Sequence, residues 1–308
     1  MPNLLVVLGP TASGKTRLGV ELALRLGGEV ISADSRQVYR GLDLGAGKDL
    51  DAYEAGGRRV PHHLIDCADL SEEFSVYHFQ RAFYAAFETV RQRARLPVLV
   101  GGTGLYLESV LLDYPLVESK PDPVLRAELA RLDSAVLAEG LLRLKPDLHN
   151  RTDLDNRERL VRAVEIALAG KTGQPAEHPR LEAYVAGLRW NRDRLRERIA
   201  RRLRERLAAG MIAEVAGLHE RGVSWERLRS LGLEYRHVAD FLLGAIRSEE
   251  DLFRRLALEI GRLAKRQETW FRRMERRGIR IHWVSGEEMG AAADEVENGL
   301  KSAGTSPA

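Results

Sequence analysis

Short apolar runs alternate with amphipathic stretches along residues 3–112 of the chain. Four of these runs have the length and composition of buried strands: residues 4–8, 30–33, 60–66 and 97–100. Residues 76–95 instead carry helical periodicity, with one apolar face made of Phe79, Phe83, Ala86, Phe87 and Val90. The alternation predicts an α/β fold built on a doubly wound parallel sheet, whose ligands bind beyond the carboxyl ends of the strands.

The pattern changes at residue 116. Prolines recur and the helices become short over residues 116–182, notably at 123–132 and 157–169. This segment predicts a helical insertion into a core formed by residues 1–115 and 183–287. Arginine-rich helices are expected at 192–209 and 252–277, and a last strand at 279–284. Residues 288–308 are expected to form a tail that is partly disordered, because residues 302–308 are rich in small residues.

A complete phosphate-binding loop follows the first strand: Gly9-Pro10-Thr11-Ala12-Ser13-Gly14-Lys15-Thr16. It stands between an apolar strand and an amphipathic helix, which is the context that this motif requires. Gly9 and Gly14 allow the backbone to curl so that its N–H groups face an anion, and the helix N-terminus adds partial positive charge. Lys15 can reach terminal phosphates, and the Thr16 hydroxyl can hold Mg²⁺. The sequence therefore predicts a P-loop core that binds a diphosphate or triphosphate.

Polar residues end three of the other predicted strands. Asp34 can serve as a general base or a Mg²⁺ ligand, or it can cap the following turn together with Ser35. Asp66 can organise a metal as the corresponding residue of an ATPase does. The third strand ends in Gly101-Gly102-Thr103-Gly104, where an ATPase carries an aspartate. That loop is suited to holding a phosphate more than to hydrolysing one.

The arginines gather between Arg189 and Arg280, although the net charge is only +3. Arginine recognises phosphate in a bidentate manner and stacks on bases, so the clustering indicates a polyanionic partner. Arg192, Arg198 and Arg202 can stabilise a departing diphosphate; alternatively they form a solvated face paired with Glu197 and Glu205.

The segment Lys265-Arg266-Gln267-Glu268-Thr269-Trp270-Phe271-Arg272-Arg273 mixes cations, amides and aromatic residues. This combination suits phosphate contacts and base stacking in RNA, unless Trp270 and Phe271 belong to the core.

The composition narrows the classes further. No apolar stretch approaches the ~20 residues that span a bilayer, and the N-terminus lacks a signal-peptide pattern, so a cytoplasmic protein without a membrane partner is expected. The single cysteine, Cys67, excludes an intramolecular disulfide and a multi-cysteine metal site.

Several motifs taken together resemble the bacterial tRNA dimethylallyltransferases (tRNA isopentenyltransferases) over nearly the whole chain. Besides the phosphate-binding loop, these are Asp34-Ser35-Arg36-Gln37-Val38-Tyr39, Pro61-His62-His63-Leu64-Ile65-Asp66, Val100-Gly101-Gly102-Thr103-Gly104-Leu105-Tyr106, Asp155-Asn156-Arg157-Glu158-Arg159-Leu160-Val161-Arg162 and Lys265-Arg266-Gln267-Glu268-Thr269-Trp270-Phe271. The order and spacing of the motifs match as well as their letters.

The resemblance implies transfer of a dimethylallyl group from dimethylallyl diphosphate to the exocyclic amine of the adenosine 3′ of the anticodon. It implies Asp34 as general base, Thr103 near the reacting centre and Arg202 on the diphosphate, with Mg²⁺ as cofactor at Thr16. It also implies a monomer that grips the tRNA anticodon stem-loop through Asp34, Ser35, Arg36, Gln37, Arg126, Glu158, Arg159, Leu160, Val161, Arg162, Lys265, Arg266, Gln267, Thr269, Trp270 and Arg272.

One element departs from the family pattern. The family often has Gly-Tyr-Arg/Lys where this chain reads Gly232-Leu233-Glu234-Tyr235-Arg236, so the roles of Arg229, Tyr235 and Arg236 stay open. Three other functions compete with the tRNA prenyltransferase. An adenylate isopentenyltransferase acting on free AMP, ADP or ATP would not need the block at 265–271. A small-molecule kinase would share the phosphate-binding loop but not the motifs at 34–37 and 101–104. A non-catalytic RNA-binding relative would not need to retain Lys15, Thr16, Asp34 and Thr103.

Overall fold

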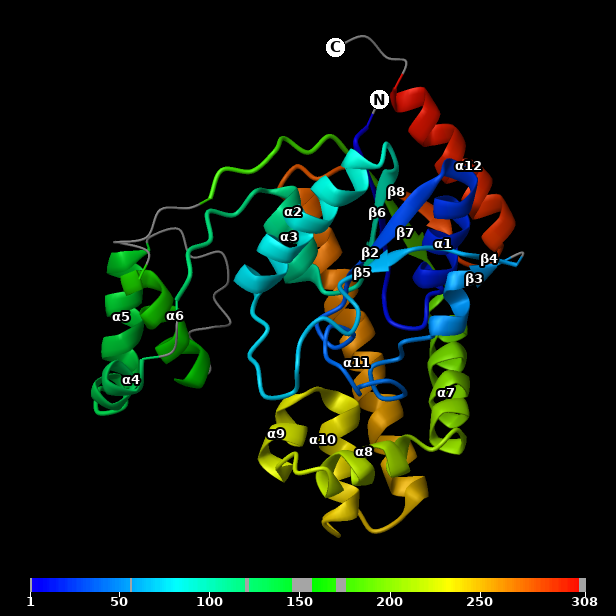
Figure 1. Ribbon diagram of the computed structural model, residues 1–308. Helices are drawn as coiled ribbons and strands as arrows, with labels where there is room; N and C mark the ends of the chain where they lie inside the picture. The colour runs from blue at the N-terminus through cyan, green and yellow to red at the C-terminus, as the bar shows by residue number, and fades with distance from the viewer. Residues whose placement is uncertain (1, 56, 120–121, 146–156, 170–175, 305–308) are drawn as a thin grey trace. The chain divides into compact units, whose positions relative to one another are not determined.

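Six parallel strands form the central sheet of the computed structural model, in the order β5-β2-β6-β1-β7-β8 (Figure 1). The structure describes residues 2–55, 57–119, 122–145, 157–169 and 176–304. The strands are β1 (Leu4–Leu8), β2 (Gly28–Ala33), β5 (His62–His63), β6 (Leu96–Gly101), β7 (Ala183–Arg189) and β8 (Ile281–Ser285). A short 3₁₀ helix, η1 (Leu50–Tyr53), precedes a two-stranded hairpin of β3 (Glu54–Ala55) and β4 (Arg58–Arg59). The predicted α/β class with a parallel sheet is confirmed.

The strand β1 lies at the centre of the sheet, because the chain adds strands first on one side of it and then on the other. Leu5 is paired with Val98 of β6 on one side and with Tyr184 of β7 on the other. The strand order therefore reverses at β1, and its carboxyl end is the place where an open α/β sheet binds its ligand. The phosphate-binding loop leaves the sheet at this point.

Alternating side chains of the strands build two apolar cores, one on each face of the sheet. Leu5 and Val7 of β1 face α1 (Lys15–Leu26) and α12 (Met289–Ala303), which lie side by side in Figure 1. Leu4, Val6 and Leu8 face α2 (Val76–Gln92), α3 (Gly104–Leu111) and the end of α11 (Glu249–Arg276). Because β1 is covered on both faces, it is apolar throughout and all five of its residues are buried.

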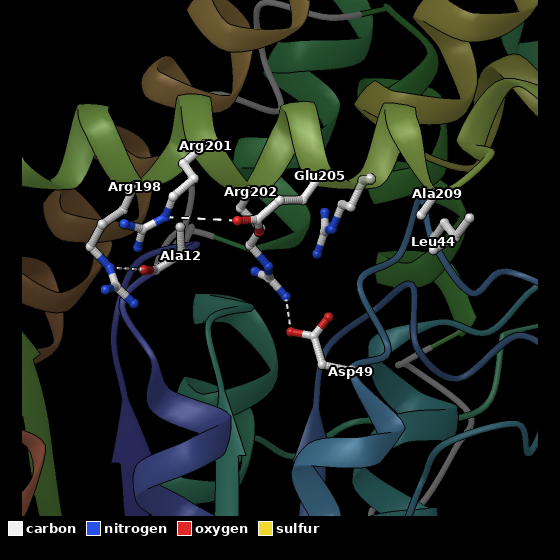
Figure 2. A pocket seen from close by; sticks show the side chains of 9 residues that line it. Ala12, Leu44, Asp49, Arg198, Arg201, Arg202, Glu205 and Ala209 are labelled. Atoms are coloured by element: carbon white, nitrogen blue, oxygen red, sulfur yellow. Dashed lines mark hydrogen bonds and ion pairs between the residues drawn. The ribbon is translucent and has the colours of Figure 1, made fainter.

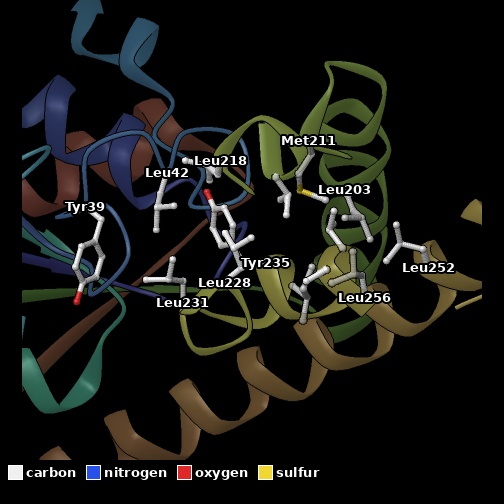
Figure 3. Packing of buried hydrophobic residues seen from close by; sticks show 14 of the residues in the cluster. Tyr39, Leu42, Leu203, Met211, Leu218, Leu228, Leu231, Tyr235, Leu252 and Leu256 are labelled. Atoms are coloured by element: carbon white, nitrogen blue, oxygen red, sulfur yellow. The ribbon is translucent and has the colours of Figure 1, made fainter. Parts of the chain in front are cut away.

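A separate helical core stands at the carboxyl side of the sheet (Figure 3). It is formed by α7 (Arg192–Ala208), α8 (Met211–Glu220), α9 (Trp225–Ser230), α10 (Leu233–Leu242) and the first half of α11. Tyr39 and Leu42, which follow β2, pack into the same core. The arginine-rich helix α7 is therefore fixed on the side of the sheet from which the phosphate-binding loop emerges.

The residues from Asp113 to His178 form a compact unit of their own. Its described helices are α4 (Pro123–Leu129), α5 (Ser134–Leu144) and α6 (Arg157–Ala169), which bury Leu129, Leu137, Leu141, Leu160 and Val164. The carboxylate of Asp122 accepts from the N–H groups of Val124 and Leu125 and so caps α4. The predicted insertion covered residues 116–182. The observed unit begins three residues earlier and ends four residues earlier.

Three of the differences from the expectations have a local explanation. The run at 60–66 contains only a two-residue strand, because Leu64 and Asp66 adopt positive φ and turn the chain away. Strand β7 was not predicted, since alanine and glycine interrupt its apolar residues. Helix α12 occupies residues expected as a tail; half of its buried residues are alanine, which gives a weak hydrophobic signal. Residues 305–308 of that tail lie outside the described part of the chain. Within the described part, no helix is long and apolar enough to cross a membrane.

Candidate active site

The phosphate-binding loop has a left-handed backbone at two positions before α1 begins at Lys15. Ala12 has a φ of 61° and Gly14 a φ of 90°. The glycine adopts this conformation at no cost, whereas the alanine is strained by about 1–3 kcal/mol and must be held by its surroundings. The shape of the loop therefore depends on the groups packed around it.

Three side chains from distant parts of the chain hold this loop. Trp190 Nε1 donates to the Ser13 carbonyl at 2.9 Å, and Arg198 Nε donates to the Ala12 carbonyl at 2.9 Å. On the other side, the Thr11 N–H donates to Gln267 Oε1 at 2.8 Å. The Arg198 guanidinium also lies 4.3 Å from the centroid of the Trp190 ring, which fixes both donors. The strained loop is thus anchored from α7 and α11.

A cavity of about 350 Å³ opens between the loop and α7. Figure 2 shows Arg198 and Arg202 descending from one side of α7 toward Ala12 and Asp49. Arg206 lies one turn further along, so the three guanidiniums follow the i, i+4, i+8 row of the helix. The cavity is lined by Ala12, Leu44, Asp49, Arg198, Arg201, Arg202, Glu205, Arg206 and Ala209.

The charges around this cavity are only partly neutralised. Arg202 is paired with Asp49, but Arg206 has only Glu234 at 3.9 Å, and its buried Nε has no hydrogen-bond partner among the described residues. Burial and the neighbouring Arg202 lower the pKa of Arg206, and burial together with Arg201 and Arg202 lowers that of Arg198. Desolvation lowers the pKa of Lys15 to about 8. Mutually repelling, partly desolvated cations favour binding of a polyanion.

Gly47 connects the arginine face to the strand ends. Its carbonyl accepts from Gln37 Nε2 at 3.1 Å and from Arg202 Nη2 at 3.4 Å. Its φ is 63°, and a Cβ built there would lie 1.6 Å from Arg206 Nη2. Glycine allows this approach without displacing the Arg206 guanidinium, so the turn that carries Asp34 and the arginines of α7 meet at one backbone group.

Asp34 and Thr103 come together where β2 and β6 end. Asp34 Oδ1 accepts from the N–H groups of Arg36 at 2.9 Å and Gln37 at 3.4 Å, so the capping role left open by the sequence is present. Its Oδ2 makes no hydrogen bond to a described residue and can take a proton. Thr103 Oγ1 accepts from the Ser35 N–H at 3.2 Å and thereby holds the same turn. Asp34 also acts electrostatically on Lys15.

Asp66, which the sequence offered as a metal-organising residue, forms an ion pair in the structure. Asp66 is paired with Lys48, whose side chain is fully buried and also binds Asp43 at 3.0 Å. Asp66 therefore takes part in a structural ion pair, and the ATPase-like metal role considered for it stays a prediction. In the described part of the chain, no group of three or more His, Cys, Asp or Glu residues is placed to hold a metal. A metal here would depend on the ligand's own oxygens, as is usual for Mg²⁺.

The predicted RNA-binding segment of α11 divides into an outer and an inner face. Lys265, Arg266, Thr269 and Arg272 are exposed. Gln267 and Trp270 turn inward: Gln267 binds the phosphate-binding loop, and the Trp270 ring packs against the Cα of Gly104. Phe271 is fully buried, so the core alternative holds for it. Trp270 is partly buried against the same core.

The insertion uses two of its predicted tRNA contacts internally. Arg126 donates to both oxygens of Glu165 at 2.8 and 3.0 Å, and Arg162 donates to the same carboxylate at 3.2 Å. Leu160 is fully buried and Val161 packs beside it, whereas Glu158 and Arg159 are exposed. Asp155 and Asn156 of the same motif lie outside the described residues.

The three residues whose roles the sequence left open also have internal partners. Tyr235 is buried and its hydroxyl donates to Glu214 at 2.7 Å, Arg229 is paired with Asp240 at 2.6 Å, and Arg236 donates to the Arg229 carbonyl. Sequence reasoning missed Trp190, Gly47 and Arg206 as parts of the site. Only Arg206 left a signal, since it continues the four-residue spacing of Arg198 and Arg202.

Comparison with known proteins decides the family. The family model described as IPP transferase matches residues 37–274. The chain belongs to the IPP transferase family. This IPP transferase is 51% identical over 305 residues to tRNA dimethylallyltransferase 1 of Syntrophus aciditrophicus, with 98% of this chain and 100% of the relative covered. It is 55% identical over 288 residues to tRNA dimethylallyltransferase 2 of Syntrophotalea carbinolica, with 92% and 94% covered.

The crystal structure of a tRNA isopentenylpyrophosphate transferase from Bacillus halodurans superposes on this IPP transferase with a TM-score of 0.68. The two are 34% identical, and 98% of each chain is covered. The resemblance that the motifs carried is confirmed, and so is the assignment to the tRNA prenyltransferases.

Proposed function

We propose that this protein transfers a dimethylallyl group from dimethylallyl diphosphate to the exocyclic amine of the adenosine 3′ of the anticodon. The observation that supports this most directly is the cavity that the α7 arginines line beside Ala12 of the phosphate-binding loop. Lys15 of the same loop feels the charges of Arg202 and Arg206. The turn that carries Asp34 meets the same arginines at Gly47. A diphosphate-binding region and a proton acceptor thus share one site.

In the proposed reaction, the adenosine nitrogen forms a bond to the allylic carbon while the bond from that carbon to the diphosphate oxygen breaks. The electron pair leaves on the diphosphate, and the nitrogen loses its proton to Asp34. An adenine amine is a poor nucleophile, so most of the catalysis should come from alignment and from stabilising the leaving group. Lys15 and Arg202 are the groups assigned to that stabilisation.

Mg²⁺ is part of this proposal. The Thr16 hydroxyl is at the start of α1, is half-buried and makes no hydrogen bond to a described residue, so it is available as a ligand. Mg²⁺ commonly binds one or two protein oxygens together with substrate phosphate oxygens, which fits the small donor set found here. When bound, the ion would neutralise charge that develops on the departing diphosphate.

The exposed cations of α11 support tRNA over a free nucleotide as acceptor. Lys265 and Arg266 make no ion pair or side-chain hydrogen bond with a described residue, and they lie beside Gln267, which reaches the site. Such unpaired cations suit the phosphates flanking a base that must leave its stack to react. The contacts of the anticodon stem-loop with the insertion, and a monomeric state, remain proposals taken from the resemblance.

The test is a labelled transfer assay. Purified protein with Mg²⁺ and labelled dimethylallyl diphosphate receives unmodified tRNA in one reaction and AMP, ADP or ATP in others. We expect label in tRNA, lost when the adenosine 3′ of the anticodon is replaced. Label in the free nucleotide alone would contradict the proposal, as would ATP consumption on a small acceptor without transfer.

An Asp34→Asn variant makes the assay specific for the proposed base. It should keep tRNA affinity within about twofold and lower the transfer rate roughly 10²–10⁴-fold, as is typical for loss of a general base. Asparagine retains an oxygen that can accept from Arg36 and Gln37, so the turn should persist. A rate close to that of the wild type would remove Asp34 from the mechanism.

A further inference from the structure

Gln267 stands in the segment that the sequence assigns to tRNA, yet both ends of its amide are engaged inside the protein. Its Oε1 accepts from the Thr11 N–H at 2.8 Å, and its Nε2 donates to the Gly102 carbonyl at 2.9 Å. The side chain therefore joins the phosphate-binding loop to the loop that follows β6. Each of its two polar atoms therefore already has a partner inside the protein.

Gly102 and the Gln267 amide are packed closely together. A Cβ built on Gly102 would lie 2.5 Å from Gln267 Nε2, 3.0 Å from the Gly9 carbonyl and 3.4 Å from Lys15 Cε. Gly102 and Gln267 thus border the cradle itself, beside the lysine assigned to the diphosphate. The glycine is needed because any side chain there would push the amide away.

Two consequences for an anion follow from these hydrogen bonds. The Thr11 N–H is fixed next to Ala12, whose left-handed φ of 61° requires external support. The carbonyl of Gly102, a residue close to Lys15, accepts from Nε2, so its partial negative charge is partly neutralised. Gln267 therefore both shapes the loop and reduces the negative potential at its edge.

We propose that Gln267 is a positioning residue of the diphosphate site, which holds the phosphate-binding loop in its anion-binding shape, and that it is not a contact to tRNA. This inference rests on the proposed function, because it assumes that the loop receives the diphosphate of the prenyl donor. It separates two adjacent positions of α11: Arg266 on the outer face serves the RNA, and Gln267 on the inner face serves the donor.

The experiment measures binding of inorganic diphosphate with Mg²⁺ by calorimetry, and binding of unmodified tRNA by filter retention, for the full chain. Gln267→Met keeps the length of the side chain and removes both hydrogen bonds. We expect its diphosphate affinity to fall roughly 5–30-fold, as the loss of two neutral hydrogen bonds implies, with tRNA affinity within about twofold. In the transfer assay, KM should rise for the donor and stay unchanged for tRNA.

Gln92→Met is the matched control, because Gln92 is exposed at the last position of α2. It should change neither affinity. Gly102→Ala is a second variant that displaces the amide while leaving Gln267 in place, and it should weaken diphosphate binding in the same direction. It decides the matter if Gln267→Met does not fold.

The outcomes separate this inference from the proposed function. A wild-type protein that binds no diphosphate would contradict the proposed function and the inference together. Wild-type binding with unchanged affinity in Gln267→Met, or in Gly102→Ala where the first variant is unfolded, would overturn the inference alone. A loss of tRNA affinity with diphosphate binding retained would also overturn it and return Gln267 to the RNA interface.

Discussion

On α7, Arg198, Arg202 and Arg206 share one cavity, whereas in the insertion Arg126 and Arg162 converge on the carboxylate of Glu165. Both groups are arginines on helices. The sequence offers Arg198 and Arg202 for a departing diphosphate, and the resemblance implies Arg126 and Arg162 as tRNA contacts. The surroundings differ. Glu165 is almost completely buried and accepts from both guanidiniums of the insertion. Near the α7 arginines, Asp49 and Glu205 are largely exposed, and the more buried Glu234 lies 3.9 Å from Arg206.

The difference shows in the pKa values. Burial alone would raise the pKa of Glu165, but hydrogen bonds from Arg126, the Asp122 N–H and Arg162 outweigh it and lower the pKa. On α7 the shift falls on the cations, since burial and neighbouring arginines lower the pKa of Arg198 and Arg206. An arginine that stabilises a buried carboxylate is structural, and an arginine left among other cations is available to a ligand.

Removing the shared carboxylate should have the largest effect. Glu165→Gln removes the buried carboxylate charge that Arg126 and Arg162 share, and we expect a loss of about 2–4 kcal/mol in the unfolding free energy. Hydrogen exchange in α4, α5 and α6 would report it. Glu128→Gln is the control, because Glu128 is exposed on α4 and should change stability by less than about 0.5 kcal/mol. Equal protection in both variants would make the Glu165 cluster dispensable.

The stability that Glu165 contributes through Arg126 and Arg162 should depend on pH with a defined sign. Because the folded-state pKa of Glu165 lies below its unfolded value, its contribution is complete above the unfolded pKa and disappears as the pH falls through the folded one. Wild-type protection in the insertion should therefore weaken in acid, and Glu165→Gln should abolish that part of the dependence.

How far the sequence alone reaches depends on whether a feature is local. The phosphate-binding loop is a continuous motif between a strand and a helix, and the structure has it where it was predicted. The bonds that hold the loop are not local: Gln267 is 256 positions from Thr11. No spacing rule reports such a contact, so a glutamine inside an arginine-rich segment is assigned to RNA by its neighbours.

The arginines also show that sequence spacing reports local relations and misses distant ones. Spacing predicts that Arg198 and Arg202 share a helix face, which the structure confirms. It cannot tell whether a carboxylate from elsewhere meets an arginine, and here Glu165 meets Arg126 across 39 positions. The residues predicted for tRNA binding on the outer face of α11 were assigned by the same reasoning, and their role stays a prediction.

The second largest effect is expected on α7. Arg202→Gln should lower the affinity for Mg²⁺-diphosphate about 10–100-fold, because charged hydrogen bonds to phosphate are lost. Stability should hardly change, since the substitution also relieves the repulsion that Arg202 exerts on Arg198 and Arg206. Calorimetry with a thermal unfolding scan measures both. Arg194→Gln, an exposed position of the same helix, is the control. Destabilisation without weaker binding would place Arg202 with the structural arginines.

A moderate effect should come from pH at Lys15. Its folded-state pKa is about 8, below the ordinary value of 10.5, because of desolvation. Diphosphate affinity should therefore fall by up to about tenfold per pH unit above 8 as Lys15 loses its charge. Lys15→Arg is the control. Its side chain stays protonated over this range, so any pH dependence of its affinity comes from ionisation of the diphosphate itself. A decline of the same steepness in both proteins would exclude Lys15 as the titrating group.

The folding stability should respond to the same titration with the opposite sign. Between pH 8 and 10.5 the unfolded chain holds the Lys15 proton and the folded one does not, so stability rises over this window. Opposite trends of binding and stability across one pH range would identify a cation that the fold desolvates for its ligand.

The smallest effect is expected for tRNA binding by α11. It is the most direct test of the difference between binding and structural arginines. Arg266→Ala should weaken tRNA binding a few-fold and lower the slope of log affinity against log salt by about one at most, as for one lost phosphate contact. Arg126→Ala, by contrast, should destabilise the insertion while leaving the slope unchanged, because its guanidinium is committed to Glu165. Lys301→Ala on α12 is a control for a lost exposed cation. If Arg126→Ala reduced the slope and Arg266→Ala did not, pairing with a buried carboxylate would no longer separate structural arginines from binding ones.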